Sequence, residues 1–481
     1  MQLAIDIIKM LIQSLAEVLG LLFEIFKKDH RLRANFGSKR ALKRKHTGYA
    51  VGNLRLASSD SDKSKIIVGP SGTGKSTIFY MNSLFSSVGN FVVLDSSGEL
   101  LKTCGAALEK RGYHIHLINP NDADSSTDGW NPLEELKISS ESTKSFATLL
   151  INNAMSRTSD VFWNLSSISV LAFFMDYMFE ALPEQQHTLF HLKNLLQQFA
   201  GDPESCDIKF SDPTVSDSTF NAYKAFVASD SKITTGVLAN CQAALGVFDN
   251  EDVVRVTSHH TFSMERFINS EKQVVFIQNS VLSQEFLRPV NSVFFYFFFE
   301  TLMRKLRPNN APMCYFLIDE ASSIKLGSML PLCLVNLRKF RASICLGVQS
   351  FQQLETLYSR EDAVNILQNC YVKVFLRNLD IQFSKTISDM LGAYTYQDSK
   401  SETDRNRMLL EPDMIRSMKQ EECLLFVGAE RGVYLKGIKP FYKIKKHLAL
   451  SKLPPPQLEM GHLPMPLLGS TRDAFVKPDG L

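Results

Sequence analysis

The sequence predicts an α/β protein that has a mainly parallel sheet, an inserted all-α domain and an N-terminal amphipathic helix. A glycine-rich loop at 69–77 lies between an apolar run typical of a buried strand and a helix-compatible run. Short apolar runs then alternate with helix-compatible segments, and this alternation favours a parallel sheet. Residues 141–265 carry helical patterning, which indicates an all-α domain between two halves of the sheet.

Composition places the chain among globular proteins. Its 481 residues are enough for about two to four domains, and its hydrophobic share of 44% and charged share of 21% are ordinary. The net charge of +3 gives no global field that would mark a nucleic-acid binder. The eight cysteines form no C-x-x-C pair, which indicates reduced, buried thiols in a cytosolic compartment and argues against a disulfide frame or a zinc site.

Residues 1–26 are expected to form an amphipathic helix. Polar residues recur at steps of three and four and leave the other faces to large apolar side chains. The charges argue against a membrane span, and no basic first segment or cleavage site supports a secretory signal. Three interpretations remain open: the helix packs against a partner helix or its own copies, packs on its own domain, or lies on a membrane surface.

Residues 27–64 are expected to be a basic linker and a strand that leads into the nucleotide-binding domain. Within 27–46, nine Lys and Arg residues stand against one Asp. This segment is either a solvated linker or an arm that binds the phosphates of anionic lipid or nucleic acid.

The loop at 69–77 matches the G-x-x-x-x-G-K-[ST] pattern of a phosphate-binding loop, and its strand–loop–helix context supports the match. Glycines let backbone N–H groups point inward at an anion, and the helix that follows adds its positive end. We expect Lys75 to reach the β- and γ-phosphates of ATP and Ser76 to offer its hydroxyl to Mg²⁺. The predicted nucleotide-binding residues are Gly69, Pro70, Ser71, Gly72, Thr73, Gly74, Lys75, Ser76 and Thr77.

The nucleotide-binding domain is predicted in two parts, at 65–140 and 266–450. The first part has further strand candidates at 91–95 and 114–118. In the second part, 273–277 is a strand candidate, and the phenylalanine-rich segment 286–306 suits a helix buried in the core.

An apolar strand candidate at 313–318 ends in Asp319 and Glu320. The carboxyl end of a parallel strand delivers such side chains to the edge of the sheet where a phosphate loop lies. We expect Asp319 to hold Mg²⁺ through water and Glu320 to polarise the attacking water. A further strand ends at Gln349, which either senses the γ-phosphate or caps the strand end.

These segments, in this order, resemble the type IV secretion coupling proteins, the hexameric P-loop ATPases that pass DNA–relaxase complexes to conjugation channels. The resemblance runs from about residue 65 to residue 445 and rests first on GPSGTGKST and LIDEASSIKLG. The other matching segments are VVLDSSGEL with HLINP, WNPL at 130–133, FW at 162–163, LRKFRASICLGVQSFQQLETLY, VKVFLRNLDIQFSKTISDMLG and RMLLEPDMIRSM.

The resemblance implies a RecA-like nucleotide-binding domain with an inserted all-α domain, in agreement with the pattern of the residues. It implies ATP bound with Mg²⁺ at Ser76 and Asp319, and the catalytic residues Lys75, Glu320, Gln349 and Arg338. Arg338 lies where the family places an Arg before the sensor strand, so we expect it to reach the ATP of a neighbouring subunit; Arg377 is the second candidate. A surface ion pair is the alternative for either Arg.

The chain also departs from the family pattern. Family members usually begin with transmembrane helices, whereas residues 1–26 do not read as one. Two alternatives stay open: the chain is a soluble member of the family, or it reaches the membrane through that helix or a membrane partner. Ser97 stands where the family often has Lys, and Met414 where an acidic residue is usual. The tail, 451–481, is rich in proline, lacks the acidic run often thought to recruit substrate, and is expected to be loose.

The main hypothesis is an ATP-driven motor that couples relaxase-bound single-stranded DNA to a secretion channel. It implies DNA, relaxase and channel proteins as partners, a homohexamer as the active form, and a place in the cytoplasm or at the inner face of the cell membrane. Two alternatives stay open: a motor of the same fold that works outside conjugation on DNA or protein, and a nucleotide-gated adaptor that binds ATP without hydrolysing it.

Overall fold

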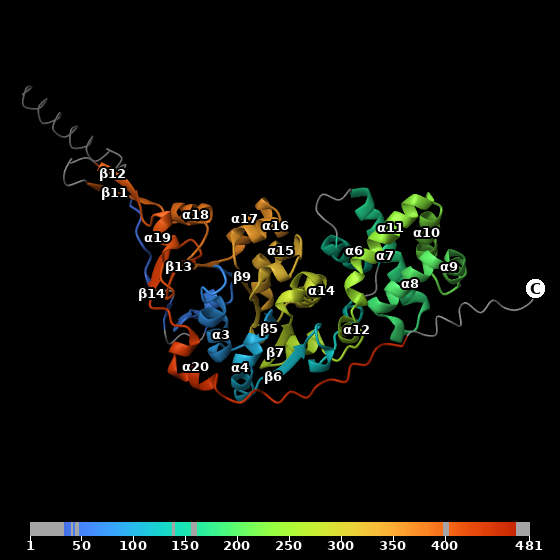
Figure 1. Cartoon of the computed structure of the whole chain (residues 1–481), viewed down its shortest axis with the longest axis horizontal. Helices are drawn as coiled ribbons and strands as arrows, with labels where there is room; N and C mark the ends of the chain where they lie inside the picture. The colour runs from blue at the N-terminus through green and yellow to red at the C-terminus, as the bar shows by residue number, and fades with distance from the viewer. Residues whose placement is uncertain are drawn as a thin grey trace, which may run out of the picture.

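The structure is a computed structural model that describes residues 33–39, 42–43, 48–136, 140–154, 161–397 and 404–467. The predicted helix at 1–26 lies outside these residues, as do parts of the basic segment and the end of the tail. A body that contains the main sheet lies beside a lobe built from helices (Figure 1).

The body is organised by a nine-stranded sheet with the order β14-β13-β10-β4-β9-β8-β5-β7-β6. The seven strands from β10 to β6 are parallel, and β13 and β14 are antiparallel to their neighbours. Buried on both faces, the parallel strands read as nearly continuous apolar runs, and this is why they could be predicted. The strands are β4 (Lys65–Val68), β5 (Asn90–Asp95), β6 (His114–Ile118), β7 (Gln273–Gln278), β8 (Cys314–Ile318), β9 (Ala342–Val348), β10 (Val372–Phe375), β13 (Glu422–Val427) and β14 (Val433–Lys436).

The order of three central strands positions the site. β9 lies between β4 and β8, with Val348 opposite Val68 and Leu346 opposite Ile318. All three strands run in the same direction, so the loop after β4, the acidic pair after β8 and Gln349 after β9 emerge at one edge of the sheet.

Each face of the sheet has its own core. Ile66 and Val68 of β4 belong to one core, and Ile67 between them belongs to the other. Helix α14 (Gln284–Met303) covers the first face and packs Phe299 against Phe316 of β8, with ring centroids 4.8 Å apart. This helix is the predicted phenylalanine-rich helix. On the second face lie α3 (Met81–Ser86) and α4 (Glu99–Lys110). The other α-helices of the body are α2 (Ser58–Ser61), α15 (Met329–Asn336), α16 (Phe351–Leu357), α17 (Arg360–Asn369), α18 (Ile381–Leu391), α19 (Pro412–Arg416) and α20 (Lys445–Leu450).

The helical lobe lies between β6 and β7 in the chain, and the described residues of this segment contain no strand. Asp202 and Ser216 cap helices with their side chains, which explains the polar punctuation of the sequence. Aromatic side chains fill the core of the lobe; Phe210 and Tyr223 stack with centroids 4.0 Å apart. The helices are α5 (Pro132–Glu135), α6 (Ser140–Ala154), α7 (Val161–Ala181), α8 (Leu189–Gly201), α9 (Pro203–Phe210), α10 (Asp217–Val227), α11 (Ser231–Ala244), α12 (Glu251–Thr257) and α13 (Met264–Asn269).

Helix α7 is the one helix of the described residues that is long and apolar enough to cross a membrane. Half of its most apolar window is buried inside the protein, where it packs against α6, α10 and α11. Length and composition alone are weak grounds for a membrane span, because the core helix of a helical lobe meets the same criteria.

Short strands form two further sheets. β1 (Leu42–Lys43), β3 (Leu54–Leu56) and β2 (Ala50–Val51) form a three-stranded sheet in that order, where a single leading strand was expected. β11 (Ala393–Gln397) and β12 (Asp404–Met408) pair as a two-stranded ribbon that projects from the body (Figure 1).

The tail is ordered along its described part, so the expectation of a loose tail is wrong for residues 451–467. It runs as an extended strap from α20 to the helical lobe (Figure 1). The backbone N–H of Gly461 donates to Ser126 O at 2.8 Å, and Arg255 Nε donates to Leu463 O at 2.7 Å. Leu463 is buried in the core that also contains Ile66 and Val68 of β4. The proline-rich composition suggested a loose tail because it could not reveal these partners.

Candidate functional site

The phosphate-loop motif forms a tight turn between β4 and a helix. Gly72 and Gly74 have φ angles of 75° and 104°, in the left-handed region that only glycine enters without strain. After Gly74, a π-helical turn (η2, Lys75–Tyr80) continues into α3. The first N–H groups of this helix therefore face the inside of the loop, as an anion site requires.

Lys75 is buried and folds back over the loop. Its Nζ donates to Gly69 O at 2.6 Å and to Pro70 O at 3.4 Å. Burial lowers the pKa of Lys75, while the nearby Asp319 and Glu320 carboxylates oppose that shift. A carbonyl is a weaker partner for an ammonium than a phosphate is, so an anion in the loop gives Lys75 a better contact than it has here.

Ser76 and Asp319 meet although they are 243 residues apart in the chain. Ser76 Oγ donates to Asp319 Oδ2 at 2.8 Å, and Tyr80 Oη donates to Ile318 O at 3.1 Å, which ties the same helix to the end of β8. Burial raises the pKa of Asp319 to about 6, against the opposing effects of the Ser76 hydroxyl and the Lys75 charge. The sequence led us to expect that the phosphate loop and the acidic pair lie at the same edge of the sheet, and this contact lies there.

The same pair of residues fits a magnesium ion. Asp319 Oδ1 is shut off from solvent and has no hydrogen-bond partner among the described residues. A buried carboxylate oxygen without a partner is costly, and a cation would relieve that cost. A hydroxyl and a carboxylate are the hard oxygen ligands that Mg²⁺ prefers, together with water and phosphate.

Glu320 is buried and engaged through both carboxylate oxygens. Ser322 Oγ donates to Oε1 at 2.8 Å, and Gln349 Nε2 donates to Oε2. Gln349 therefore contacts Glu320 from the end of β9, which favours the sensor interpretation over a simple strand cap. Ser322 was not among the predicted site residues, because nothing in the sequence marks a serine two positions after an acidic pair.

Asp95 is a further acidic residue at this edge. It ends β5 next to β8, is buried, and accepts a hydrogen bond from Leu101 N at 2.9 Å. Burial raises the pKa of Asp95 to about 6. The contact of the Asp95 carboxylate with the first turn of α4 explains why an Asp stands at the end of β5. The carboxylate anchors the helix that covers the sheet.

The two candidate arginines lie at different edges of the sheet. Arg338 is exposed and precedes β9, whereas Gln349 follows it, so Arg338 lies at the edge opposite the phosphate loop of its own chain. Arg377 follows Leu376, whose N–H donates to Val68 O at 2.9 Å, and so lies beside the loop of its own chain. Arg377 Nε is buried and has no hydrogen-bond partner within the described part of the chain.

The fold and the site together define a class. One strand separates the phosphate-loop strand from the strand that carries the acidic pair, and a helical lobe is inserted in the sheet domain. This is the arrangement of a P-loop protein of the RecA-like type with an all-α insertion. The fold predicted from the sequence is thereby confirmed.

Comparison with known proteins identifies the family. Residues 24–457 match the family model described as type IV secretory system conjugative DNA transfer. The match covers most of the chain, which therefore belongs to this family, and the resemblance seen in the sequence is confirmed. Protein VirD4 of Rhizobium rhizogenes is 19% identical over an alignment of 394 residues. The match covers 78% of this chain and spans 58% of the length of that relative.

Solved structures share the fold. The plasmid coupling protein TrwB in complex with ADP and Mg²⁺ matches with a TM-score of 0.66 and 16% identity over 87% of this chain and 97% of that one. TrwB in complex with the non-hydrolysable ATP analogue ADPNP also gives 0.66, at 16% identity over 85% and 95%. VirB4 of Thermoanaerobacter pseudethanolicus gives 0.52 at 14% identity over 83% and 98%.

Proposed function

We propose that this chain is an ATP-hydrolysing motor that recruits relaxase-bound single-stranded DNA and drives its transfer through a type IV secretion channel. The observation that carries hydrolysis is the contact of Ser76 with Asp319 at 2.8 Å, with Glu320 as the next residue. Family membership supports the transfer role, and the TrwB complexes with ADP, Mg²⁺ and ADPNP support the same ligands for this loop.

Each site residue has a proposed role. The loop N–H groups of 69–77 and Lys75 bind the phosphates, and Ser76 and Asp319 hold Mg²⁺, which neutralises phosphate charge when bound. Glu320 accepts a proton from the attacking water as the water oxygen bonds to the γ-phosphorus and the bond to ADP breaks. Gln349 donates to Glu320 in this structure, so it links the position of the base to the end of β9.

A ring of subunits is proposed as the active form, and a homohexamer is the expected size. Arg338 lies at the edge opposite its own phosphate loop, which fits a residue that serves a neighbour's nucleotide and not its own. Arg377, beside its own loop, is better suited to the nucleotide of its own chain. This assignment favours Arg338 as the residue that acts between subunits.

Relaxase and secretion-channel proteins are proposed as partners, together with the DNA. The proposed location is the cytoplasm or the inner face of the cell membrane, with membrane contact through residues 1–26 or through a membrane partner. Membrane fractionation of the full chain beside a version that lacks residues 1–46 tests this: sedimentation of both versions with the membrane fraction would rule out the N-terminal segment as the anchor.

The deciding experiment measures ATP turnover with and without single-stranded DNA. We expect DNA to stimulate turnover, Lys75→Ala to abolish it, and Glu320→Gln to lower it by about 100-fold or more while ATP still binds. ATP binding without turnover, even with DNA, would favour the adaptor alternative. Capture of a relaxase by the wild-type chain separates conjugation from other uses of this fold, and failure to capture one would argue for a motor outside conjugation.

A further inference from the structure

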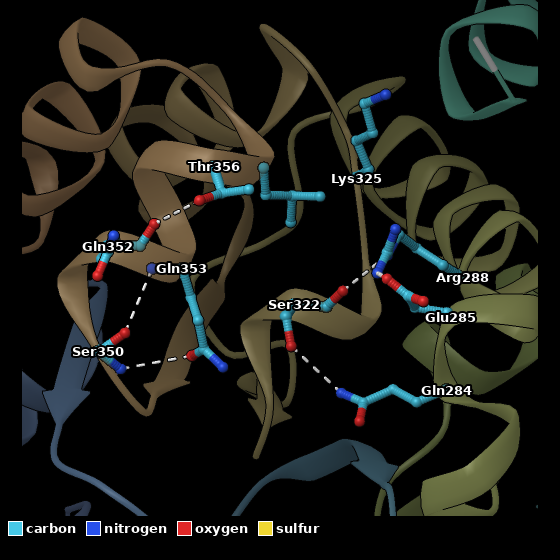
Figure 2. Close-up of a pocket in the computed structure, with 10 residues that line it drawn as sticks. Gln284, Glu285, Arg288, Ser322, Lys325, Ser350, Gln352, Gln353 and Thr356 are labelled. Atoms are coloured by element: carbon cyan, nitrogen blue, oxygen red, sulfur yellow. Dashed lines mark hydrogen bonds and ion pairs between the residues drawn. The ribbon is translucent and has the colours of Figure 1, made fainter. Parts of the chain in front are cut away.

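A polar cleft of about 640 Å³ lies beside the acidic pair. It is formed by the start of α14, the loop after β8 and the start of α16 (Figure 2). We call it the amide cleft, and the lining residues that matter here are Gln284, Arg288, Ser322, Ser350, Gln353 and Thr356.

One wall of the amide cleft includes Ser322, which is hydrogen-bonded to Glu320. Gln284 Nε2 donates to Ser322 Oγ at 3.2 Å, and Arg288 Nε donates to Ser322 O at 2.9 Å (Figure 2). Ser322 Oγ in turn donates to Glu320 Oε1 at 2.8 Å. Gln284 and Arg288 therefore both contact the serine that donates to the catalytic carboxylate.

The opposite wall reaches the other oxygen of Glu320. Ser350 directly follows Gln349, which donates to Oε2. Ser350 also caps α16, where Gln353 N donates to Ser350 Oγ at 3.3 Å and Ser350 N donates to Gln353 Oε1 at 3.4 Å (Figure 2). Both groups that hold Glu320 thus belong to, or adjoin, the walls of one cleft, and each carboxylate oxygen of Glu320 accepts a hydrogen bond from one of them.

The chemistry of the cleft suits a nucleic-acid strand. Arg288 supplies a cation, and the amides and hydroxyls around it are neutral hydrogen-bonding groups, a combination that fits a sugar–phosphate backbone. Glu285 pairs with Arg288 at 3.3 Å but is 90% exposed, and a surface pair of this kind is weak enough for a phosphate to displace. On the same segment, Leu282 is 97% exposed and Phe286 is 47% exposed, which provides apolar surface for unpaired bases.

We propose that the amide cleft binds the backbone of the transported single strand through Arg288, and that occupancy draws Ser322 away from Glu320 and frees that carboxylate for hydrolysis. This inference rests on the proposed function and deepens it, because it assigns the coupling between DNA and ATP to named residues. Hydrolysis then runs fast only when a strand fills the cleft.

The test combines DNA binding with turnover for four variants. Binding of a fluorescent oligo-dT is followed by anisotropy across a salt series, and ATPase rates are measured without DNA and at saturating DNA. The variants are Arg288→Ala, Arg288→Lys, Ser322→Ala and the control Lys110→Ala, which removes an exposed charge at the far end of α4. Binding of a fluorescent ADP analogue reports that each variant is folded.

Distinct results are expected for the two steps of the mechanism, which are strand binding by Arg288 and release of Glu320 by Ser322. Arg288→Ala should weaken oligo-dT binding, lower the slope of log K against log salt by about 0.7, and lower the stimulation by DNA. Arg288→Lys should restore the slope, since a phosphate contact needs only the charge. Ser322→Ala should keep DNA affinity within about twofold but raise turnover without DNA, so that the ratio of stimulated to basal rate falls. Lys110→Ala should match the wild type.

The outcomes separate this inference from the proposed function. If DNA stimulates the wild type and Arg288→Ala keeps the wild-type slope and stimulation, the strand does not use the cleft and the inference fails while the motor function stands. If Ser322→Ala has wild-type rates in both conditions, Ser322 does not restrain Glu320. If the wild type hydrolyses ATP without any response to DNA, the proposed DNA motor itself fails.

Discussion

The protonation of His447 tests how helix α20 stabilises the helix that follows the phosphate loop. It lies on α20, is 4% exposed, and its Nδ1 donates to Asn82 Oδ1 at 2.6 Å on α3. The Asn82 amide is oriented by its own donation to Ile78 O and Lys439 O. The imidazole stacks on Phe85 with ring centroids 5.2 Å apart, and its burial leaves little water to solvate a positive charge.

The size of the expected change in the free energy of unfolding follows from the pKa of His447. Burial, and then the charges of Arg55, Lys446 and Arg111, lower the pKa of His447 to about 4, from an ordinary value of 6.5. A histidine that is less basic in the folded protein stabilises the fold fully above the unfolded pKa, and this stability is lost as pH falls from about 6.5 towards 4. Between pH 7.5 and pH 5 the loss is about 2 kcal/mol.

The assay compares urea unfolding of the wild type and His447→Gln at these two pH values. Other groups titrate in the same range, and burial raises the pKa of Asp95 and Asp319 to about 6, which acts in the opposite direction. Only the difference between the two proteins in this loss of unfolding free energy reports the contribution of His447. The wild type should lose about 2 kcal/mol more than His447→Gln on acidification. An equal loss in both proteins would refute the argument that His447 is buried in its neutral form.

Three further predictions concern the tail and the site. Leu463→Ala should lower the free energy of unfolding by about 2–4 kcal/mol and the exposed Met465→Ala by less than about 0.5 kcal/mol, measured by denaturant titration; equal effects would mean that the tail is not docked. Ser76→Ala should weaken binding of a fluorescent ADP analogue about tenfold with Mg²⁺ and little in EDTA, and an equal loss in both would contradict a metal role. Arg377→Ala should lower the nucleotide affinity of the isolated subunit by calorimetry, whereas Arg338→Ala should lower only the turnover of the assembled protein; the reverse pattern would exchange their roles.

The parts of the site that could be predicted are those encoded by local patterns. The glycine spacing fixes the turn before Lys75, and a buried parallel strand must deliver Asp319 to its carboxyl edge. The sheet, the phenylalanine-rich helix and the all-helical segment were visible because burial on both faces leaves apolar runs. All eight cysteines are buried and free, as the sequence predicted.

The parts that could not be predicted depend on contacts between distant segments. Ser322 and Gln349 hold Glu320 from two different loops, and no spacing in the sequence marks their meeting. The tail looked loose because proline-rich composition reports backbone preference, whereas its order comes from Leu463 and from partners about 200 and more residues away, such as Arg255.

The place of β9 in the sheet explains how one site can respond to two ligands. β9 separates the phosphate-loop strand from the acidic strand, so Gln349 at its end stands between them and contacts Glu320. The next residue, Ser350, begins α16 and forms a wall of the amide cleft. A shift of this single strand end would therefore alter the contact with the catalytic carboxylate and the shape of the cleft together. The strand order therefore places the contact with Glu320 and a wall of the cleft on two consecutive residues, which is the geometry that the proposed coupling between an occupied cleft and a bound nucleotide requires.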